Sequence, residues 1–258
     1  MFSADDITQG LTTGVVGSRV VCLDSTDSTN LRARELADQG TPEGTVIVAD
    51  QQTAGRGRQG RSWRSEPGTS LLFSVLLRPS LPPDQRVLLT FAAATAVAEA
   101  VERVTRRPPE TKWPNDLLLG GLKFCGILLE GTLGRAQTGS VIVGIGINVN
   151  QTSMPDGLRL PATSLRMVTG APVDRITLLR SALGSLDRWY ASLQQGDAGA
   201  VLNAWRARCR MFGRPAVVDQ GGRKHPVTVL RLADDGGLVV DHGSRTETVY
   251  AADVTTVS

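Results

Sequence analysis

The sequence predicts an α+β domain, with a mixed β-sheet flanked by helices, followed by a small all-β module. Two features of the apolar patterning carry this prediction. An alanine-rich apolar stretch opens at Pro82 and continues to Thr105, which is typical of a helix lying across a sheet. From Gly213 onward, short strand patterns alternate with glycine turns, which favours a small barrel. We therefore expect two domains, residues 1–212 and residues 213–258.

The remaining elements of the first domain follow from capping residues, turns and apolar runs. Ser28 or Thr29 is expected to cap a helix that ends at Gly40, and the residues before this helix are predicted to be irregular. Gly120-Gly121 is expected to join two strands as a hairpin. The expected strands are Thr45–Ala49, Leu71–Leu77, Leu117–Leu119, Leu122–Glu130 and Ser140–Asn150, and the later helices are Asp174–Leu193 and Ala198–Arg210.

The C-terminal module is predicted to hold short strands with turns at Gly221-Gly222 and Asp235–Gly237. Its expected strands are Ala216–Asp219, Pro226–Leu232, Leu238–Asp241 and Thr246–Tyr250.

Composition excludes several kinds of site. The histidines, His225 and His242, both lie near the C-terminus, which removes Ser-His-Asp triads and histidine-ligated zinc from the rest of the chain. A net charge of +3 is too small to indicate nucleic acid by itself. No stretch is long enough to span a bilayer and the N-terminus does not resemble a signal peptide, so we expect a cytosolic protein without membrane contact. Only Lys112, Lys123 and Lys224 are lysines among 28 basic residues, which suggests positions where a compact ammonium is needed.

Gly55–Arg64 places four arginines and three glycines in ten residues. Such charge on a freely bending backbone suits the binding of an anion, and phosphate is the expected one. The spacing also matches dinucleotide-binding and P-loop patterns, but both require a helix that starts at the glycines. Here Pro67-Gly68 and then a strand follow, so we expect a long loop between strands. A solvated basic loop is the alternative.

Lys112–Asp116 combines a cation, an aromatic ring, a proline turn and two polar groups. This segment predicts polar side chains presented from an extended turn. The alternative is a polar turn in which Trp113 only fills the core.

In the predicted strand Leu122–Glu130, strict alternation places Lys123 on the same face as Cys125 and Ile127, with Glu130 on the opposite face. A buried ammonium without an acidic partner requires an anion, so we expect a bound phosphate or carboxylate there. The alternative is a lysine that extends past the sheet edge.

Gly144, Gly146 and Asn148 are expected to share one bare strand face. Glycine within a strand marks the close approach of a ligand or of another element, and both explanations remain open. At the end of this face the Asn148 amide is expected to contact a polar ligand.

Taken together, these motifs resemble biotin protein ligase from residue 24 to about residue 258. The matching segments, in chain order, are Asp27–Asn30, Gln52 with Gly55–Trp63, Lys112–Asp116, Lys123 with Gly126–Leu128, and Gly144–Asn150. The resemblance implies a class II synthetase-like catalytic domain that binds biotin and ATP, and a C-terminal SH3-like β-barrel.

The resemblance implies that biotin is activated by ATP and Mg²⁺ as biotinoyl-5′-AMP and is then transferred to a lysine of a biotin carboxyl carrier protein of acetyl-CoA or related carboxylases. Lys123, Arg58 and Asp116 are the implied catalytic residues, with Asp116 orienting Mg²⁺ or accepting a proton; no metal ligands are assigned. The implied biotin-binding residues are Ser28, Thr29, Asn30, Gln52, Arg56, Gly57, Arg58 and Lys123. The implied ATP-binding residues are Arg58, Trp63, Asn115, Lys123 and Asn148.

Many bacterial members of this family carry an N-terminal repressor domain, and 23 residues before Asp24 are too few for it, so we expect no binding to nucleic acid. One alternative is a lipoate ligase or octanoyltransferase, which lacks this Gly-Arg-Gly-Arg loop. Another is a binder without catalysis, either a biotin sensor or an RNA-binding protein, although Trp63 alone in the loop offers no stacking platform. The sequence does not distinguish monomer from dimer.

Overall fold

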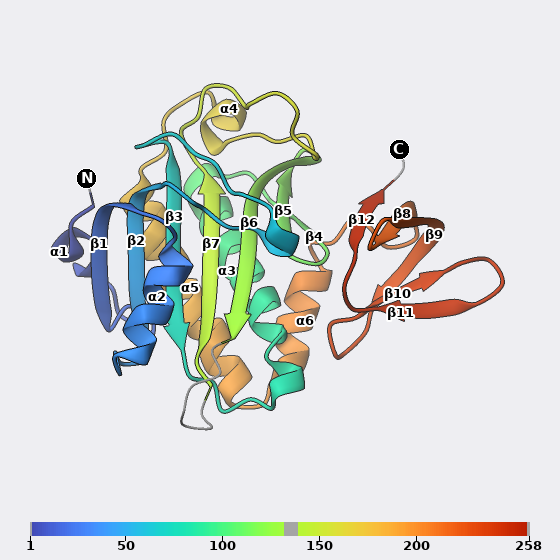
Figure 1. The fold of residues 1–258 in the computed structure, drawn as a ribbon, viewed down its shortest axis with the longest axis horizontal. Helices are drawn as coiled ribbons and strands as arrows, with labels where there is room; N and C mark the ends of the chain where they lie inside the picture. The colour runs from blue at the N-terminus through green and yellow to red at the C-terminus, as the bar shows by residue number, and fades with distance from the viewer. Residues whose placement is uncertain (1, 132–138, 257–258) are drawn as a thin grey trace.

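A seven-stranded mixed sheet forms the centre of the larger part of the protein (Figure 1). The structure is a computed structural model that describes residues 2–131 and 139–256; the ends of both expected domain ranges, Met1 and residues 257–258, lie outside the described residues. The strand order is β1-β2-β3-β7-β6-β5-β4, and only the β1–β2 pair is parallel. The strands are β1 (Arg19–Thr26), β2 (Thr45–Gln52), β3 (Ser70–Leu77), β4 (Glu110–Lys112), β5 (Asp116–Leu119), β6 (Leu122–Gly131) and β7 (Val141–Asn148).

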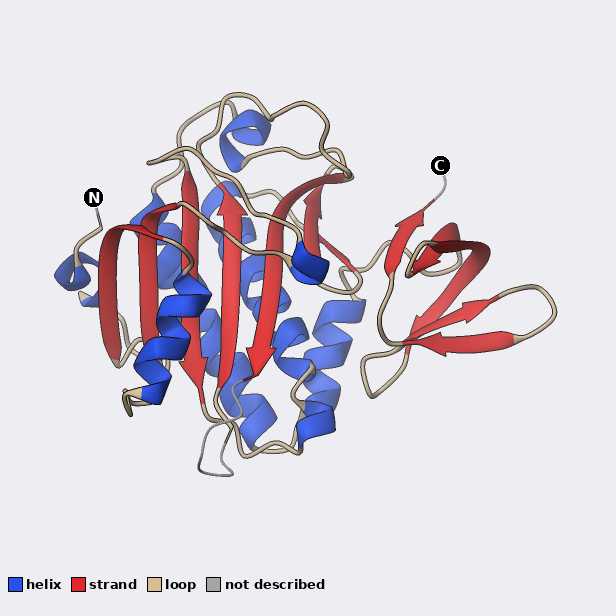
Figure 2. Ribbon diagram, in the orientation of Figure 1, coloured by secondary structure: helices blue, strands red, loops and turns tan. Residues whose placement is uncertain are grey.

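Helices cover the two faces of this sheet unequally (Figures 1 and 2). Behind the sheet in Figure 1, α3 packs against both α5 and α6, whereas α2 covers part of the front face. The uncovered part of the front face is therefore available for a site. The helices are α1 (Ala4–Thr8), α2 (Thr29–Asp38), α3 (Leu88–Thr105), α4 (Leu165–Thr169), α5 (Arg175–Gln194) and α6 (Ala198–Arg206), with 3-10 turns η1 (Arg58–Gly60) and η2 (Pro83–Gln85).

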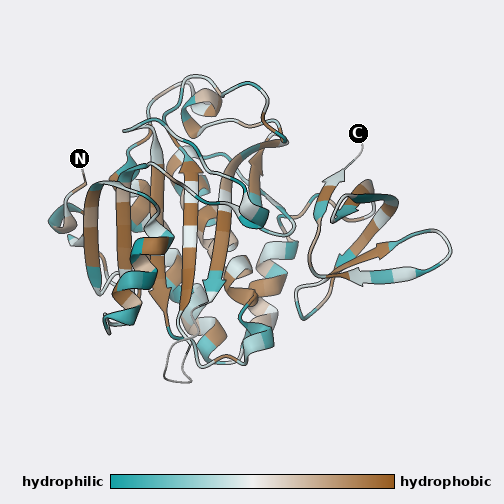
Figure 3. Ribbon diagram, viewed as in Figure 1, coloured by the Kyte–Doolittle hydropathy of each residue, from teal (hydrophilic) through white to brown (hydrophobic). Residues whose placement is uncertain are grey.

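The core lies between the sheet and the helices behind it. Every residue of β3 is buried, and the strand centres form an apolar band in Figure 3. The run of alanines in α3 is buried, since small side chains let this helix lie close to its neighbours. No helix in the described ranges is both long and apolar enough to cross a membrane.

A second, five-stranded antiparallel sheet follows α6 and has the order β11-β10-β9-β8-β12. Val218, Val229 and Val254 contribute to its core. The indole Nε1 of Trp113 donates a hydrogen bond to the carbonyl of Gly236 at 3.0 Å, which fastens this sheet to the turn between β4 and β5. Its strands are β8 (Pro215–Gln220), β9 (Arg223–Leu232), β10 (Leu238–Asp241), β11 (Thr246–Val249) and β12 (Asp253–Thr256).

The α+β class, the flanking helices and the C-terminal antiparallel sheet are confirmed. The prediction that the N-terminal residues are irregular was wrong, because α1 and β1 lie there. β1 is an edge strand without a fully buried residue, and its apolar run, Val20–Leu23, is only four residues long. The short elements β4, α4 and β12, each of five residues or fewer, were also not predicted.

Strict alternation in β6 was also wrong, because the strand contains a bulge. Leu117 of β5 pairs with Cys125, but the next residue, Leu118, pairs with Lys123, so Phe124 is the extra residue. Lys123 therefore shares a face with Gly126, while Cys125 lies in the core.

Candidate active site

A cavity of about 950 Å³ occupies the front face of the large sheet. Its floor is formed by β6 and β7, and its walls by the start of α2 and by two loops. We call residues 53–69 the arginine loop and residues 149–164 the cap loop. Every site residue expected from the sequence lines this cavity: Ser28, Thr29, Asn30, Gln52, Arg56, Gly57, Arg58, Trp63, Asn115, Asp116, Lys123 and Asn148.

The two glycines of β7 make room for protein side chains. A Cβ on Gly144 would lie 2.1 Å from Asn30 Oδ1, and a Cβ on Gly146 would lie 2.8 Å from the Trp63 ring. Of the two explanations left open by the sequence, the packing of other elements is the one that the structure bears out. The bare strand thus positions Asn30 and Trp63 on the floor of the cavity.

Five polar side chains form what we call the amide cluster: Thr29, Asn30, Gln52, Ser74 and Glu130. Gln52 Oε1 accepts hydrogen bonds from the Thr29 backbone N at 2.7 Å and from the Thr29 hydroxyl at 3.0 Å. Ser74 Oγ lies 2.6 Å from Asn30 Oδ1, and Asn30 Nδ2 donates to Glu130 Oε2 at 2.7 Å. Because each amide is held by several partners, its orientation is fixed before any ligand arrives.

Residues beside the amide cluster connect it to the arginine loop. Ser28 occupies the N-cap position of α2, but its hydroxyl makes no capping hydrogen bond. Arg56 Nη2 lies 3.3 Å from Glu130 Oε1, and Arg34 Nη2 lies 3.7 Å from the same oxygen. Glu130 therefore joins the amide cluster to the arginine loop.

The arginine loop folds back on itself as a small hairpin. Gly57 N donates to Arg61 O at 2.7 Å, and Trp63 N donates to Gly55 O at 2.8 Å. Apart from η1, no helix occurs in this loop, and β3 follows it. The rejection of the two helix-dependent phosphate patterns is therefore confirmed.

Trp63 lies between the arginine loop and the sheet. Its ring centroid is 5.8 Å from Lys123 Nζ, and a Cβ on Gly126 would come within 3.1 Å of the indole. Its Nε1 is buried and has no hydrogen-bond partner in the described part of the chain. Trp63 thus offers a cation–π contact to Lys123 and one free donor.

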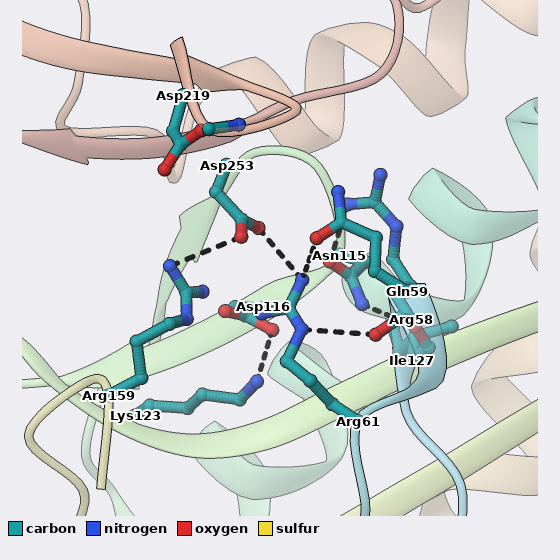
Figure 4. A network of polar contacts seen from close by, with 11 residues as sticks. Arg58, Gln59, Arg61, Asn115, Asp116, Lys123, Ile127, Arg159, Asp219 and Asp253 are labelled. Carbon is teal, nitrogen blue, oxygen red and sulfur yellow. Dashed lines mark hydrogen bonds and ion pairs between the residues drawn. The ribbon is translucent and has the colours of Figure 1, made fainter. Parts of the chain in front are cut away.

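Lys123 has an acidic partner, which the sequence analysis did not foresee. Its Nζ lies 2.6 Å from Asp116 Oδ1 of β5, because the bulge in β6 turns Lys123 to the cavity that Asp116 also lines (Figure 4). The backbone of Lys123 is held by the cap loop, through its N to Pro161 O and its O to Thr163 N, both at 2.9 Å. The prediction that Lys123 needs a bound anion was therefore based on the wrong strand face for this residue, and Asp116 is its partner.

Arg58 and Asn115 form a second contact between the arginine loop and the sheet. Arg58 Nη1 donates to Asn115 Oδ1 at 3.2 Å, and Asn115 Nδ2 donates to Ile127 O at 2.6 Å (Figure 4). Burial is the main influence on the pKa of the Arg58 guanidinium and lowers it from its usual value. A partly desolvated cation of this kind interacts strongly with an anion in the cavity.

Lys112 is a site residue to which the sequence analysis gave no role. Its side chain is buried and lines the cavity, with no ion pair or hydrogen bond to the residues that the structure describes. Burial lowers its pKa, and the negative charge of Asp116 opposes this effect. Its neighbour Trp113 fills the core, since it is 1% exposed, whereas Asn115 and Asp116 of the same turn line the cavity, as expected.

Three further charged residues were not predicted. Arg61 Nη2 lies 3.0 Å from Asp253 Oδ1, and Arg159 Nη1 lies 3.3 Å from Asp253 Oδ2 (Figure 4). Arg61 belongs to the predicted anion-binding loop, which was the available signal. Nothing in the sequence pattern relates Asp253 to residues almost 200 positions away.

Asn148 is engaged by the protein itself. Its Nδ2 donates to Thr163 O at 3.1 Å, and its Oδ1 accepts from Gln151 Nε2 at 3.4 Å. The amide therefore fixes the cap loop against the end of β7.

We call Arg58, Arg61, Lys112, Lys123 and Arg159 the cationic cluster. Across the whole cavity, eight Lys or Arg side chains face four Asp or Glu side chains. No group of three or more His, Cys, Asp or Glu able to hold a metal ion occurs among the described residues. The cavity is therefore suited to a polyanion held by charge and hydrogen bonds.

This fold and sequence are those of a ligase. The sequence pattern of the Biotin/lipoate A/B protein ligase family matches residues 22–148. The chain is 35% identical over 254 residues to the bifunctional ligase/repressor BirA of Bacillus spizizenii, covering 98% of this chain and 78% of that protein. It is 37% identical to the biotin–(acetyl-CoA-carboxylase) ligase of Mycobacterium tuberculosis, covering 89% and 85%.

The biotin protein ligase from Aquifex aeolicus in complex with biotin and ATP has a similar structure. Its TM-score is 0.81 at 30% identity, with 93% of this chain and 99% of that chain covered. The chain belongs to the biotin protein ligase family.

Proposed function

We propose that this protein joins biotin to a lysine of a biotin carboxyl carrier protein in two steps that consume ATP. The observation that carries the proposal is that Thr29, Asn30 and Gln52 of the amide cluster line the same cavity as the cationic cluster. The neutral Thr29, Asn30 and Gln52 side chains, already held in place by hydrogen bonds, suit the ureido group of biotin, and a set of cations suits a triphosphate. Biotin and ATP are named in the complex of the similar Aquifex ligase.

In the first step, a carboxylate oxygen of biotin attacks the α-phosphorus of ATP and pyrophosphate leaves. Both reactants are anions, so their approach is opposed by charge repulsion. We propose that Arg58 and Lys123 neutralise the developing charge, which is the main electrostatic contribution expected of such a site. Trp63, Asn115 and Asn148 are proposed to border the adenosine, and Ser28, Arg56 and Gly57 to border biotin.

In the second step, the amine of a carrier lysine attacks the acyl carbon of biotinoyl-5′-AMP, and AMP leaves. We propose Asp116 as the group that accepts a proton from this amine. Its ion pair with Lys123 holds the carboxylate at the cavity wall. The arginine loop is proposed to exclude water from the mixed anhydride between the two steps.

Mg²⁺ is proposed to enter with the phosphates of ATP. Ions of this kind are commonly held by one or two carboxylates together with substrate phosphates, and Asp116 is the carboxylate that we propose for this role. When bound, Mg²⁺ would neutralise phosphate charge.

Three other parts of the proposal follow the sequence analysis. We propose residues 1–212 as the catalytic domain and residues 213–258 as a separate SH3-like domain, which expression of each part alone would test. We also propose a cytoplasmic location, where carboxylase carrier domains are available. The repressor activity in the name of the Bacillus relative is not part of this proposal. Binding of a labelled operator at nanomolar protein concentration would contradict this part of the proposal.

The decisive experiment is ATP–pyrophosphate exchange with biotin, lipoate or octanoate as the acid. We expect exchange with biotin, and incorporation of biotin into a purified carrier domain when the carrier is added. Exchange with lipoate or octanoate alone would favour the other branch of the family. A protein that bound biotin without exchange would be a binder rather than a ligase.

A further inference from the structure

Two arginines from different loops converge on one carboxylate at the edge of the cavity. Arg61 comes from the arginine loop and Arg159 from the cap loop, and each contacts a different oxygen of Asp253, at 3.0 Å and 3.3 Å. Asp253 is the first residue of β12. It is the only cavity-lining residue from the C-terminal sheet among those that the structure describes.

The stability of the C-terminal sheet does not explain an aspartate at this position. Asp253 pairs directly with Asp219 across β12 and β8, and like charges placed opposite each other in a sheet are destabilising. Asp219 accepts a hydrogen bond from Gly222 N at 2.8 Å and has no ion pair with any described residue. The two carboxylates thus lie opposite each other on neighbouring strands, and only Asp253 of the two contacts arginines.

We propose that Asp253 is a positioning residue that holds Arg61 and Arg159 in the place of a phosphate, and that the triphosphate of ATP displaces it. This inference rests on the proposed function. A guanidinium binds carboxylate and phosphate oxygens with the same planar set of donors, so one anion replaces the other without a new type of contact. The side chains of Arg61 and Arg159 are 36% and 44% exposed, which leaves them room to turn toward a ligand.

The displacement of Asp253 by ATP would have two effects. ATP must compete with a carboxylate that belongs to the protein, so Asp253 lowers the affinity for ATP. Once the arginines have moved to the phosphates, the C-terminal sheet loses two of its ion pairs with the loops that cover the cavity. ATP binding and the attachment of this sheet are therefore coupled.

The test compares Asp253→Asn with Asp219→Asn in ATP–pyrophosphate exchange. We expect Asp253→Asn to lower the KM for ATP about threefold, the size expected for partly exposed ion pairs, with the KM for biotin unchanged. Asp219→Asn, which removes the same charge from the opposite strand, should change neither KM. An unchanged or raised KM for ATP in Asp253→Asn would overturn the proposal.

A second comparison separates displacement from a general change in charge. In an Arg61→Gln, Arg159→Gln background, Asp253→Asn should have no further effect on the KM for ATP, because its arginines are already absent. A persisting threefold decrease would mean that Asp253 acts only through the overall field, and the proposal would be wrong.

Calorimetry with inorganic tripolyphosphate makes the test independent of catalysis. We expect tripolyphosphate to bind Asp253→Asn about threefold more tightly than wild type, and equal affinities would refute the displacement. Absence of exchange with biotin in the wild-type protein would contradict the proposed function, whereas the tripolyphosphate comparison would still decide the role of Asp253.

Discussion

Members of the amide cluster line the same cavity as the cationic cluster, but the two clusters are held in different ways. In the amide cluster, hydrogen bonds among Thr29, Asn30, Gln52 and Ser74 satisfy the polar groups within the protein. In the cationic cluster, Lys123 is paired with Asp116, whereas Lys112 has no partner among the described residues.

This difference indicates two ways of preparing a site for a ligand. A hydrogen-bonded amide is fixed in one orientation and selects a ligand by shape and by polar edges. An excess of positive charge selects by charge and depends on an anion to complete it. Changes in the cationic cluster should therefore affect chemistry and nucleotide, and changes near the amide cluster should affect biotin.

The largest effect is expected from Arg58→Ala and Lys123→Ala. Each removes a cation that we propose to stabilise charge during adenylate formation, so exchange should fall about 100-fold or more. Lys224→Ala, on the exposed start of β9, should retain wild-type exchange. If either of the first two variants kept the wild-type rate, its proposed role would be wrong.

The ion pair of Lys123 adds a stability effect that Arg58→Ala should lack. Removal of Lys123 leaves Asp116 buried without its partner, which lowers the free energy of unfolding. A Lys123→Ala, Asp116→Asn variant should recover the stability but not the activity. Thermal unfolding and exchange rates measured on the same samples separate the two effects.

Two glycine substitutions should separate effects on biotin from effects on ATP. A methyl group on Gly144 would collide with Asn30, whereas one on Gly146 would collide with Trp63. We expect Gly144→Ala to raise the KM for biotin and Gly146→Ala to raise the KM for ATP, each about tenfold. Gly131→Ala is the matched control, because its Cβ would meet no atom of the described residues within 4 Å. Equal effects of the two variants on both substrates would contradict the division.

The sequence predicted which residues line the cavity better than it predicted their contacts. The motif residues can be recognised from residue type and spacing along the chain, such as the arginines and glycines at Gly55–Arg64. The strand face on which each side chain lies was less predictable, since one extra residue, Phe124, reverses the alternation that placed Lys123 in the core. A bulge depends on the partner strand and leaves no periodic signal in its own.

Contacts between distant segments were beyond the sequence analysis for another reason. Arg61, Arg159 and Asp253 come together only because the arginine loop, the cap loop and β12 meet at the cavity. β12 itself was missed, because the residues that separate it from β11, Tyr250–Ala252, include no glycine or proline to mark a turn. β4, the three-residue strand that positions Lys112, was also missed.

Ionic strength provides a milder test of the comparison. Raising KCl from about 0.05 M to about 0.5 M shortens the screening length several-fold, so interactions of the half-exposed arginines with phosphate weaken. We expect the KM for ATP to rise about threefold and the KM for biotin to change much less. Similar increases for both substrates would mean that the amide cluster also binds by charge.

The smallest effect is expected from Lys112→Met, which should increase stability and weaken ATP binding. A buried ammonium without a partner is costly in the folded state, so Lys112→Met is expected to raise the free energy of unfolding by about 1 kcal/mol near neutral pH. The same change removes a cation from the cavity and should raise the KM for ATP. Arg166→Met, at the cavity wall on α4, removes a less buried cation and should bring no such gain in stability.

The pH dependence of this stability difference follows from the direction of the pKa shift. Burial lowers the pKa of Lys112 in the folded protein below its usual 10.5, so the unfolded chain binds more protons between the two values. The wild-type protein should therefore gain stability relative to Lys112→Met as the pH rises through this window, while the difference stays constant at lower pH. Urea unfolding of both proteins from neutral to alkaline pH measures this, and a difference that widened with pH would mean that the Lys112 ammonium stabilises the fold.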